Sequence, residues 1–418
     1  MKLNVKKNLI VILLTLGLSG SLVFGSFIQL TTAYADTNAV PTKQLGVTYW
    51  DPSRACIGYT LYSPLGCKDI WLIDMQGNIV HHWKMRAKSG TYGKLLPNGN
   101  LLYQCAASEE QKKAVGAPTL DGQNGILYEV DWDDNLVWEY VDPFMHHDIC
   151  RLKNGNTMIL KYYAVPSDFM DKIEGGVPGT EHDNKIWADQ FDEVTPEGKV
   201  VWSWKSHEHM DPKEWPICPL CTRAEWNHGN TCYVMDNGDI LTSFRNLHKI
   251  CIIDRKTGDV KWEYGGFGVL AHQHDPHPVP PKGNILVFDN GEHRPLNNVN
   301  YSRVIEINPK NKEIEWEYGG LSTTEFYSPV CSGAQRLPNG NTMICEDTKG
   351  RIFEVTPEGE IVWEFINPQF CALGPYGSVN WVFRAYRYGP EFEGFKGKTL
   401  DSKKFQYWNG LYGKDAFN

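Results

Sequence analysis

The sequence lacks the motifs that identify nucleotide-dependent enzymes and several classes of hydrolase. After its first 35 residues it contains no GxxxxGK[ST] phosphate loop, no GxGxxG turn, no HExxH zinc motif and no GxSxG nucleophile elbow. Positive charge is also scarce, because 41 lysines and arginines stand against 50 aspartates and glutamates. Without a basic patch to offset this surplus, the composition argues against nucleic acid as a partner.

Long apolar runs are missing everywhere except at the N-terminus. There, three lysines precede the apolar residues 9–23, and Ala33-Tyr34-Ala35 matches a small-x-small cleavage site. We therefore expect residues 1–35 to be a signal peptide and residues 36–418 to be one exported domain, secreted or extracytoplasmic. Cleavage would change the net charge from −9 to −12. An uncleaved anchor is the alternative, but glycines interrupt the run, and no later stretch predicts stable membrane insertion.

Cysteine is not scarce, and all 11 cysteines follow the leader. An export signal permits disulfides, while the odd number leaves at least one thiol free, intermolecular or bound to metal. We expect Cys56 and Cys67 to form a local disulfide. The CPLC motif, Cys218 to Cys221, is interpreted first as a loop disulfide, with a redox pair or half of a zinc site as alternatives.

One pattern recurs along the chain: an apolar strand, a polar turn, and a short apolar strand that contains a tryptophan. The six copies end at Trp83, Trp138, Trp202, Trp262, Trp316 and Trp363. A second hairpin lies between them in five places, with its turn glycine at Gly99, Gly155, Gly238, Gly283 and Gly340. Four of these five turns contain Asn-Gly, which predicts tight two-residue turns with positive φ at both central residues.

Two hairpins per repeat give four antiparallel strands, which is the size of a propeller blade. We therefore predict an all-β fold, a six-bladed β-propeller of four-stranded antiparallel blades. Because one Asn-Gly hairpin is missing, residues 381–389 near the C-terminus should complete the blade that begins with the Trp83 hairpin, so the N- and C-terminal segments close the ring. The repeated tryptophans are predicted to pack between blades rather than to act in function.

Three histidines occupy the same place in consecutive repeats. His147, His228 and His274 lie eight to ten residues before their turn glycine, as does Ser332 in the next repeat. The first strand of a blade lines the central channel, so these residues should surround one mouth of it. A second ring lies seven residues after each glycine, and consists of Tyr162, Arg245, Asn290 and Asp347. We expect Asn230, Asp148, Asp275, His293 and Arg294 on the same rim, with residues 206–227 above it as a lid.

The segments around these histidines resemble the bacterial arylsulfotransferase family. The similarity covers residues 45–389, and QHDPHPVPPKGNILVFDNG, residues 273–291, is its most specific part. The resemblance implies an exported six-bladed propeller that needs no nucleotide and transfers a sulfuryl group from an aryl sulfate to a phenol. The chain is most similar to a less characterised branch with a further histidine, here His277, and without an N-terminal β-sandwich.

The resemblance also assigns roles to individual residues. His274 matches the histidine that accepts the sulfuryl group as a sulfohistidine, and His228, Asn230 and Arg245 would hold its oxygens. His147 matches the family's earlier histidine and would transfer the proton of the phenol. We expect Asn290, His277, Arg294 and Tyr162 to line the substrate site, and no cofactor is needed.

Two other classes of function fit the same residues. His147, His228 and His274, with His277, could bind Zn²⁺ or a copper ion in a metal-dependent lyase or hydratase, with Asp148 and Asp275 orienting the imidazoles. A non-catalytic binding module is the third hypothesis. Arg245 favours the sulfuryl transfer, because a cation beside the pocket suits an anionic group better than it suits a metal ion.

Overall fold

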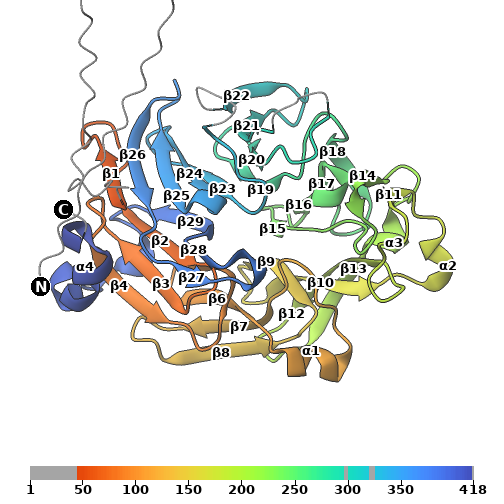
Figure 1. Cartoon of the computed structure of the whole chain (residues 1–418), viewed down its shortest axis with the longest axis horizontal. Coiled ribbons are helices and arrows are strands. Elements are labelled where there is room, and N and C mark those ends of the chain that lie inside the picture. The colour runs from red at the N-terminus through yellow and green to blue at the C-terminus, as the bar shows by residue number, and fades with distance from the viewer. Residues whose placement is uncertain (1–44, 296–299, 320–324, 417–418) are drawn as a thin grey trace, which may run out of the picture. The chain divides into compact units, whose positions relative to one another are not determined.

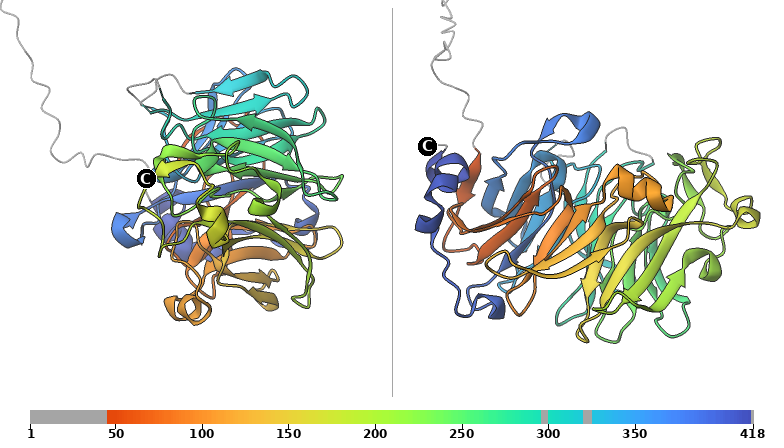
Figure 2. Two further views of the ribbon diagram at one scale, coloured as in Figure 1. Left: turned by 90° about the vertical axis from the view of Figure 1, so that its right-hand side faces the viewer. Right: turned by 90° about the horizontal axis from the view of Figure 1, so that it is seen from below.

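The computed structural model describes residues 45–295, 300–319 and 325–416, so the predicted signal peptide lies outside the described residues. Six antiparallel sheets follow one another in a ring (Figure 1), and two further views show neighbouring sheets packed against each other (Figure 2). This confirms the predicted six-bladed β-propeller. We number the blades I to VI in chain order.

The first three blades contain the N-terminal half of the chain. Blade I consists of β29 (Val382–Tyr388), β2 (Tyr59–Pro64), β3 (Asp69–Ile73) and β4 (Ile79–Lys84). Blade II consists of β5 (Ser89–Leu95), β6 (Leu101–Ala106), β7 (Gly125–Val130) and β8 (Leu136–Val141). Blade III consists of β9 (Met145–Arg151), β10 (Thr157–Ala164), β12 (Trp187–Val194) and β13 (Val200–Lys205).

The other three blades follow in order. Blade IV consists of β15 (Tyr233–Val234), β16 (Ile240–Phe244), β17 (Lys249–Ile253) and β18 (Val260–Gly265). Blade V consists of β19 (His274–Val279), β20 (Asn284–Asp289), β21 (Arg303–Ile307) and β22 (Ile314–Tyr318). Blade VI consists of β23 (Gly333–Arg336), β24 (Thr342–Glu346), β25 (Arg351–Val355), β26 (Ile361–Ile366) and the edge strand β1 (Gly46–Trp50).

Short elements decorate the connections between these strands. Two small sheets pair β11 (Gly175–Val177) with β14 (Ile217–Thr222) and β27 (Cys371–Ala372) with β28 (Ser378–Val379). The helices are α1 (Glu109–Val115), α2 (Ser167–Met170), α3 (Ser206–His209), α4 (Gln406–Tyr412), η1 (Arg245–Leu247), η2 (Asp347–Lys349), η3 (Gly374–Tyr376), η4 (Glu393–Phe395), η5 (Ser402–Phe405) and η6 (Lys414–Ala416). Among the described residues, no helix is long and apolar enough to cross a membrane.

The ring is closed by the two ends of the described chain, in agreement with the prediction. Strand β29 pairs with β2 in antiparallel register, with Tyr59 opposite Tyr388 and Leu61 opposite Tyr386. A second link joins the same ends, because β1 adds to the outer edge of blade VI beside β26. Both pairings satisfy backbone groups that would otherwise lie at open sheet edges.

The Asn-Gly turns are one residue longer than the dipeptide predicts. The Leu96 amide donates to the Asn100 carbonyl, and the Gly99 amide donates back to the Leu96 carbonyl, so the loop has three residues. Gly99 has φ of 85° while Asn98 is not among the residues with positive φ. This is a turn followed by one left-handed residue, and only the glycine has to take positive φ.

The predicted structural role of the repeated tryptophans takes the form of a ring of hydrogen bonds. In each blade an indole N–H donates to a backbone carbonyl in the outer turn of the next blade. The bonds join Trp83 to Asp131, Trp138 to Pro196, Trp204 to Gly258, Trp262 to Pro309, Trp316 to Pro357 and Trp363 to Met75, at 2.7–3.1 Å. In blade III the donor is Trp204, two residues beyond the predicted Trp202.

The predicted pairing of cysteines is wrong. Cys67 forms a disulfide with Cys371, across a sequence separation of 304 residues, and Cys56 is free. The two ends of the chain meet in and beside blade I, so the partner of Cys67 comes from the last repeat rather than from a nearby loop. Cys218 and Cys221 are both free thiols as well, so the loop disulfide that we expected for the CPLC motif does not form.

Candidate functional site

The three histidines that share a position in successive repeats gather at one place. The rings of His147 and His228 are 4.7 Å apart. Burial lowers the pKa of His147, and the charges of His228 and His274 lower it further. His228 also contributes to the lowered pKa of His274, behind the larger effect of burial. All three side chains are buried. Counting residues back from each turn therefore places them correctly.

The backbone around these histidines is unusual. Five of the 13 histidines have positive φ, which is an uncommon conformation for residues other than glycine: His147, His228, His248, His272 and His293. Each such residue costs about 1–3 kcal/mol and persists only where the surrounding structure holds it. Strain of this kind concentrates at functional sites. Here His147 lies in β9, and the other four histidines lie in the connections between strands.

The protonation state of His274 follows from its hydrogen bonds. Its Nδ1 lies 2.8 Å from Oδ1 of Asn290 and 3.0 Å from the carbonyl oxygen of His272. The amide group of Asn290 donates to the carbonyls of Ser328 and Cys331, which leaves Oδ1 to face the imidazole. Both neighbours of Nδ1 are acceptors, so Nδ1 carries the proton and Nε2 keeps its lone pair. Burial lowers the pKa of His274 well below its usual value, so the ring is neutral.

His147 ends a chain of polar groups that begins at a buried carboxylate. Nε2 of His146 lies 3.3 Å from Oδ1 of Asp189, and Nδ1 of His146 lies 2.9 Å from Nδ1 of His147. The contact with Asp189 is an ion-pair distance rather than a hydrogen bond, but the negative charge of Asp189 favours a proton on Nε2 of His146, so Nδ1 of His146 accepts from His147. His147 therefore also carries its proton on Nδ1, and burial lowers its pKa well below the usual value.

The third imidazole is oriented by a second carboxylate. Nδ1 of His228 lies 2.9 Å from Oε2 of Glu225, which is buried, and the pKa of Glu225 is lowered by His228 against the effect of burial. His228 therefore has the same tautomer as the other two. Within the described chain, Nε2 of His147, His228 and His274 has no hydrogen-bond partner, so all three present this atom for chemistry.

Arg245 supplies positive charge beside these rings. It is the first residue of η1 and is half-buried, and its guanidinium donates to Oε2 of Glu292 at 2.8 Å. Its charge contributes to the lowered pKa of both His147 and His274, which places it near both imidazoles. A neutral nucleophile next to a guanidinium is suited to an anionic substrate.

The other predicted site residues have different surroundings. The Asn230 amide donates to the Gln273 carbonyl at 2.8 Å, and Tyr162 stacks on His146 with ring centroids 3.7 Å apart. Arg294 is buried and pairs with Asp289 at 2.8 Å. His277 is half-buried and contacts the carbonyl of Asp275, on the part of β19 that runs toward the hairpin turn.

Asp148 and Asp275 do not orient imidazoles, so this part of the metal hypothesis is wrong. Asp148 lies 3.0 Å from the buried guanidinium of Arg384, and Asp275 lies 3.3 Å from it. Both carboxylates line a cavity of about 690 Å³ whose walls include the hairpin-turn residues Pro97 and Asn154. We predicted Asp148 and Asp275 on the same rim as His147 and His274, the histidines that directly precede them. Because successive side chains of a strand point in opposite directions, these carboxylates point away from the imidazoles.

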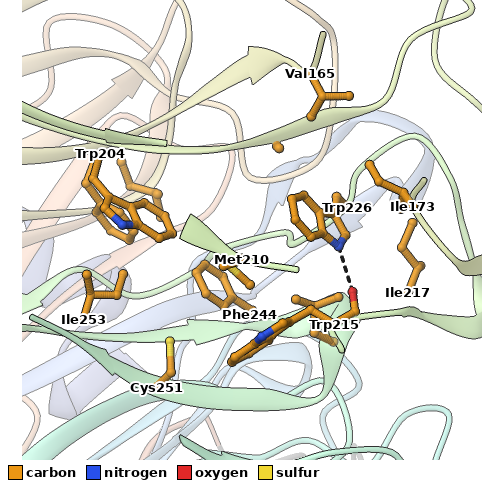
Figure 3. Close-up of a cluster of buried hydrophobic side chains, with 14 of the residues drawn as sticks. Val165, Ile173, Trp204, Met210, Trp215, Ile217, Trp226, Phe244, Cys251 and Ile253 are labelled. Atoms are coloured by element: carbon orange, nitrogen blue, oxygen red, sulfur yellow. Dashed lines mark hydrogen bonds between the residues drawn. The ribbon is translucent and has the colours of Figure 1, made fainter. Parts of the chain in front are cut away.

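The connection between blades III and IV is a packed wall rather than a loose lid. Met210, Trp215, Ile217 and Trp226 are buried in one apolar cluster (Figure 3). The indole of Trp226 donates to the Trp215 carbonyl at 2.8 Å. This segment holds β14, and it also supplies the Glu225 that binds His228.

Four side chains near this wall form the one group of described residues that could hold a metal ion. Cys218 and Cys221 of β14 meet His272 and His293 of blade V, with all four ligand atoms within 4.8 Å of one another. The group differs from the predicted metal set of His147, His228, His274 and His277. His293, predicted on the rim of the channel, faces the two thiols instead.

Sequence reasoning missed the residues that orient the imidazoles. Glu225 and Glu292 lie in connections of irregular length, and Asp189 lies within β12, so no repeat of the sequence marks these acidic residues as partners of histidines. Two short spacings could have indicated these partners. Glu225 lies three residues before His228, and His146 directly precedes His147.

Comparison with known protein families indicates the class of activity. The sequence model of the arylsulfotransferase (ASST) family matches residues 69–367. No curated protein matches the chain. Among solved structures, a protein of unknown function from Bacteroides caccae has 12% identity and a TM-score of 0.49, covering 79% of this chain and 98% of its own. A streptogramin B lyase has 11% identity and a TM-score of 0.44, covering 82% and 93%.

Proposed function

Because the chain belongs to the arylsulfotransferase family, we propose that it transfers a sulfuryl group from an aryl sulfate to a phenol, with His274 as the residue that carries the group. The observation that supports this most is the pair of acceptors at Nδ1 of His274, which leaves the Nε2 lone pair available. We place the reaction outside the cytoplasm, on the strength of the signal peptide predicted for residues 1–35.

In the first half of the proposed reaction, Nε2 of His274 attacks the sulfur atom. The bond between sulfur and the aryl oxygen breaks as the N–S bond forms, and the phenolate takes a proton from Nε2 of protonated His147. Covalent transfer through nitrogen divides one difficult substitution into two easier ones. The Asn290 side chain stabilises the positive charge that develops on the ring, because its Oδ1 accepts from Nδ1.

In the second half, the oxygen of the acceptor phenol attacks the same sulfur and the N–S bond breaks. Nε2 of His147 takes the phenolic proton, which restores the starting state. The chain Asp189, His146, His147 suits this role, because Asp189 stabilises a proton received by the histidine pair. The neutral His147 of this structure is the form that the second half requires.

The sulfuryl oxygens need donors that are already in place. We assign this role to Arg245 and to Nε2 of His228 in its protonated form, which Glu225 would stabilise. Each preorganised donor of this kind contributes about 10²–10³ in rate. Asn230 receives a different role than the resemblance suggests, because its amide holds the Gln273 carbonyl and so fixes the segment that carries His274.

The proposal is tested with two histidine variants of one strand. His274→Ala should abolish transfer from a fluorogenic aryl sulfate to phenol, a loss of at least about 10³-fold, because the nucleophile is absent. His277→Ala is the matched control. The resemblance placed His277 at the substrate site, but it lies three residues nearer the hairpin turn than His274 and its Nδ1 contacts the Asp275 carbonyl, so we expect this variant to retain most of the activity. Full activity in the His274 variant, or equal loss in both, would overturn the assignment.

A further inference from the structure

We propose that Cys218, Cys221, His272 and His293 form a structural zinc site that joins the wall between blades III and IV to blade V. Zn²⁺ in structural sites is bound by four cysteine and histidine ligands, and two of each is one of the common sets. Here the two thiols come from β14, while His272 lies two residues before β19 and His293 lies four residues after β20.

The distances between the ligand atoms fit a tetrahedral ion. With Zn–S of about 2.3 Å and Zn–N of about 2.1 Å, a sulfur and a nitrogen ligand lie about 3.6 Å apart at the tetrahedral angle. In the structure, the Cys218 and Cys221 sulfurs lie 3.6 Å and 3.5 Å from Nδ1 of His293. The Cys221 sulfur lies 3.1 Å from Nε2 of His272. The four side chains already hold the geometry that a metal requires.

The surroundings of His272 match those of a zinc ligand. Its Nδ1 lies 2.9 Å from Oε2 of Glu292, so a carboxylate fixes the tautomer and directs the Nε2 lone pair toward the thiols. The backbone at both imidazole ligands is also uncommon for a residue other than glycine, because His272 and His293 have φ of 55° and 62°. The neighbouring imidazole of His248 has a buried Nε2 without a hydrogen-bond partner among the described residues, and thiolate ligands accept such bonds.

The site is connected to the sulfuryl-transfer residues by two short links. The His272 carbonyl accepts from Nδ1 of His274, and Glu292 binds both His272 and Arg245. A bound ion would therefore hold the nucleophile and the guanidinium in position. This consequence for activity rests on the proposed function, whereas the binding of zinc does not.

The first experiment measures metal directly. The full-length mature chain is produced without a histidine tag, purified under reducing conditions with added Zn²⁺, desalted and analysed by mass spectrometry of the elements. We expect about one zinc per chain, as for a structural site, and a loss of most of it in Cys218→Ser and His293→Asn. Cys56→Ser and His182→Gln are controls from outside the cluster and should retain the ion.

Cobalt gives a second measurement that does not depend on activity. Co²⁺ in the same site should show thiolate-to-metal charge transfer and the visible absorption of tetrahedral cobalt, and both should disappear in Cys221→Ser. A wild-type chain that binds no zinc with both thiols free, or a Cys218–Cys221 disulfide in untreated protein, would refute the site. His274→Ala should lose transfer but keep zinc, so failure of the zinc site and failure of the proposed function are distinguishable.

Discussion

At the scale of single residues, Asn290 decides which nitrogen of His274 reacts. We predict that Asn290→Ala lowers the turnover number by about 10–100-fold, the usual cost of removing a group that orients a functional imidazole. The fall should appear in the pre-steady-state release of phenol from the aryl sulfate, because formation of the N–S bond is the step that depends on the tautomer. Asn300→Ala is an exposed control. An unchanged burst rate in Asn290→Ala would contradict the role assigned to this amide.

Asp347 is a second residue whose effect can be predicted, in this case on stability. It is fully buried, and burial raises its pKa from 3.8 to about 8, against smaller lowering contributions from Cys331 and Val382. Between these pH values the folded chain holds a proton that the unfolded chain has lost. The stability of the folded state therefore falls as pH rises from about 4 to about 8, by up to about 1.4 kcal/mol per unit.

Asp347→Asn removes this titration. Thermal unfolding at pH 4, 6 and 8 should show a stability difference, variant minus wild type, that becomes steadily more favourable to the variant as pH rises. Asp171→Asn, at an exposed position, should show a difference that hardly changes with pH. If the stability difference for Asp347→Asn were the same at pH 4, 6 and 8, the carboxyl would be ionised in the folded state over this whole pH range, and the assignment would be wrong.

At the scale of the elements, the hydrogen bonds that tryptophan indoles make between neighbouring blades can be tested by comparing two blades. Trp316 and Trp202 are both half-buried, and each is covered by an arginine, Arg336 or Arg255. Trp316 donates to the Pro357 carbonyl, whereas no described residue accepts from the Trp202 indole. Trp316→Phe should therefore destabilise the fold by about 1 kcal/mol more than Trp202→Phe. Equal losses in urea unfolding would show that the bond between blades contributes little.

The elements were largely predictable because each blade repeats one pattern. The tryptophan hairpin recurs six times and the turn-glycine hairpin five times, so the four-stranded blades and their order follow from the sequence. The exceptions have physical causes. The Asn-Gly dipeptide alone does not distinguish a two-residue turn from the three-residue turn that forms. In blade III the donor is Trp204, which packs with Met210 and Trp215 of the connection after β13, a contact that the repeat does not contain.

At the scale of the whole molecule, the Cys67–Cys371 disulfide reinforces the closure of the ring. It joins the loop after β2 to the segment that precedes β29. We predict that the double variant Cys67→Ser, Cys371→Ser loses about 2–5 kcal/mol of stability. The double variant Cys56→Ser, Cys150→Ser changes two free thiols and should lose much less. Matching unfolding midpoints for the two variants in guanidinium would contradict this role of the disulfide.

The candidate site was predictable only in the part that the repeat describes. His147, His228 and His274 share one place in successive blades, so counting residues from each turn glycine is enough to bring them together. The zinc ligands could not be paired in this way, because Cys218 and His272 lie on different elements and meet only through the folding of an irregular connection. The same holds for Glu225, Glu292 and the partner of Cys67, since long-range contacts outside the repeat leave no periodic trace in the sequence.

The central claim, that His274 carries the sulfuryl group, is tested most directly by trapping the intermediate. The mature protein is mixed with an aryl sulfate in the absence of acceptor, quenched in base and digested, and the peptides are mapped by mass spectrometry. We predict one added SO₃ group on the peptide that contains residues 273–291, localised to His274 and removed when phenol is supplied before quenching. A sulfuryl group on another residue, or transfer to phenol with no modified peptide at any time, would contradict the claim.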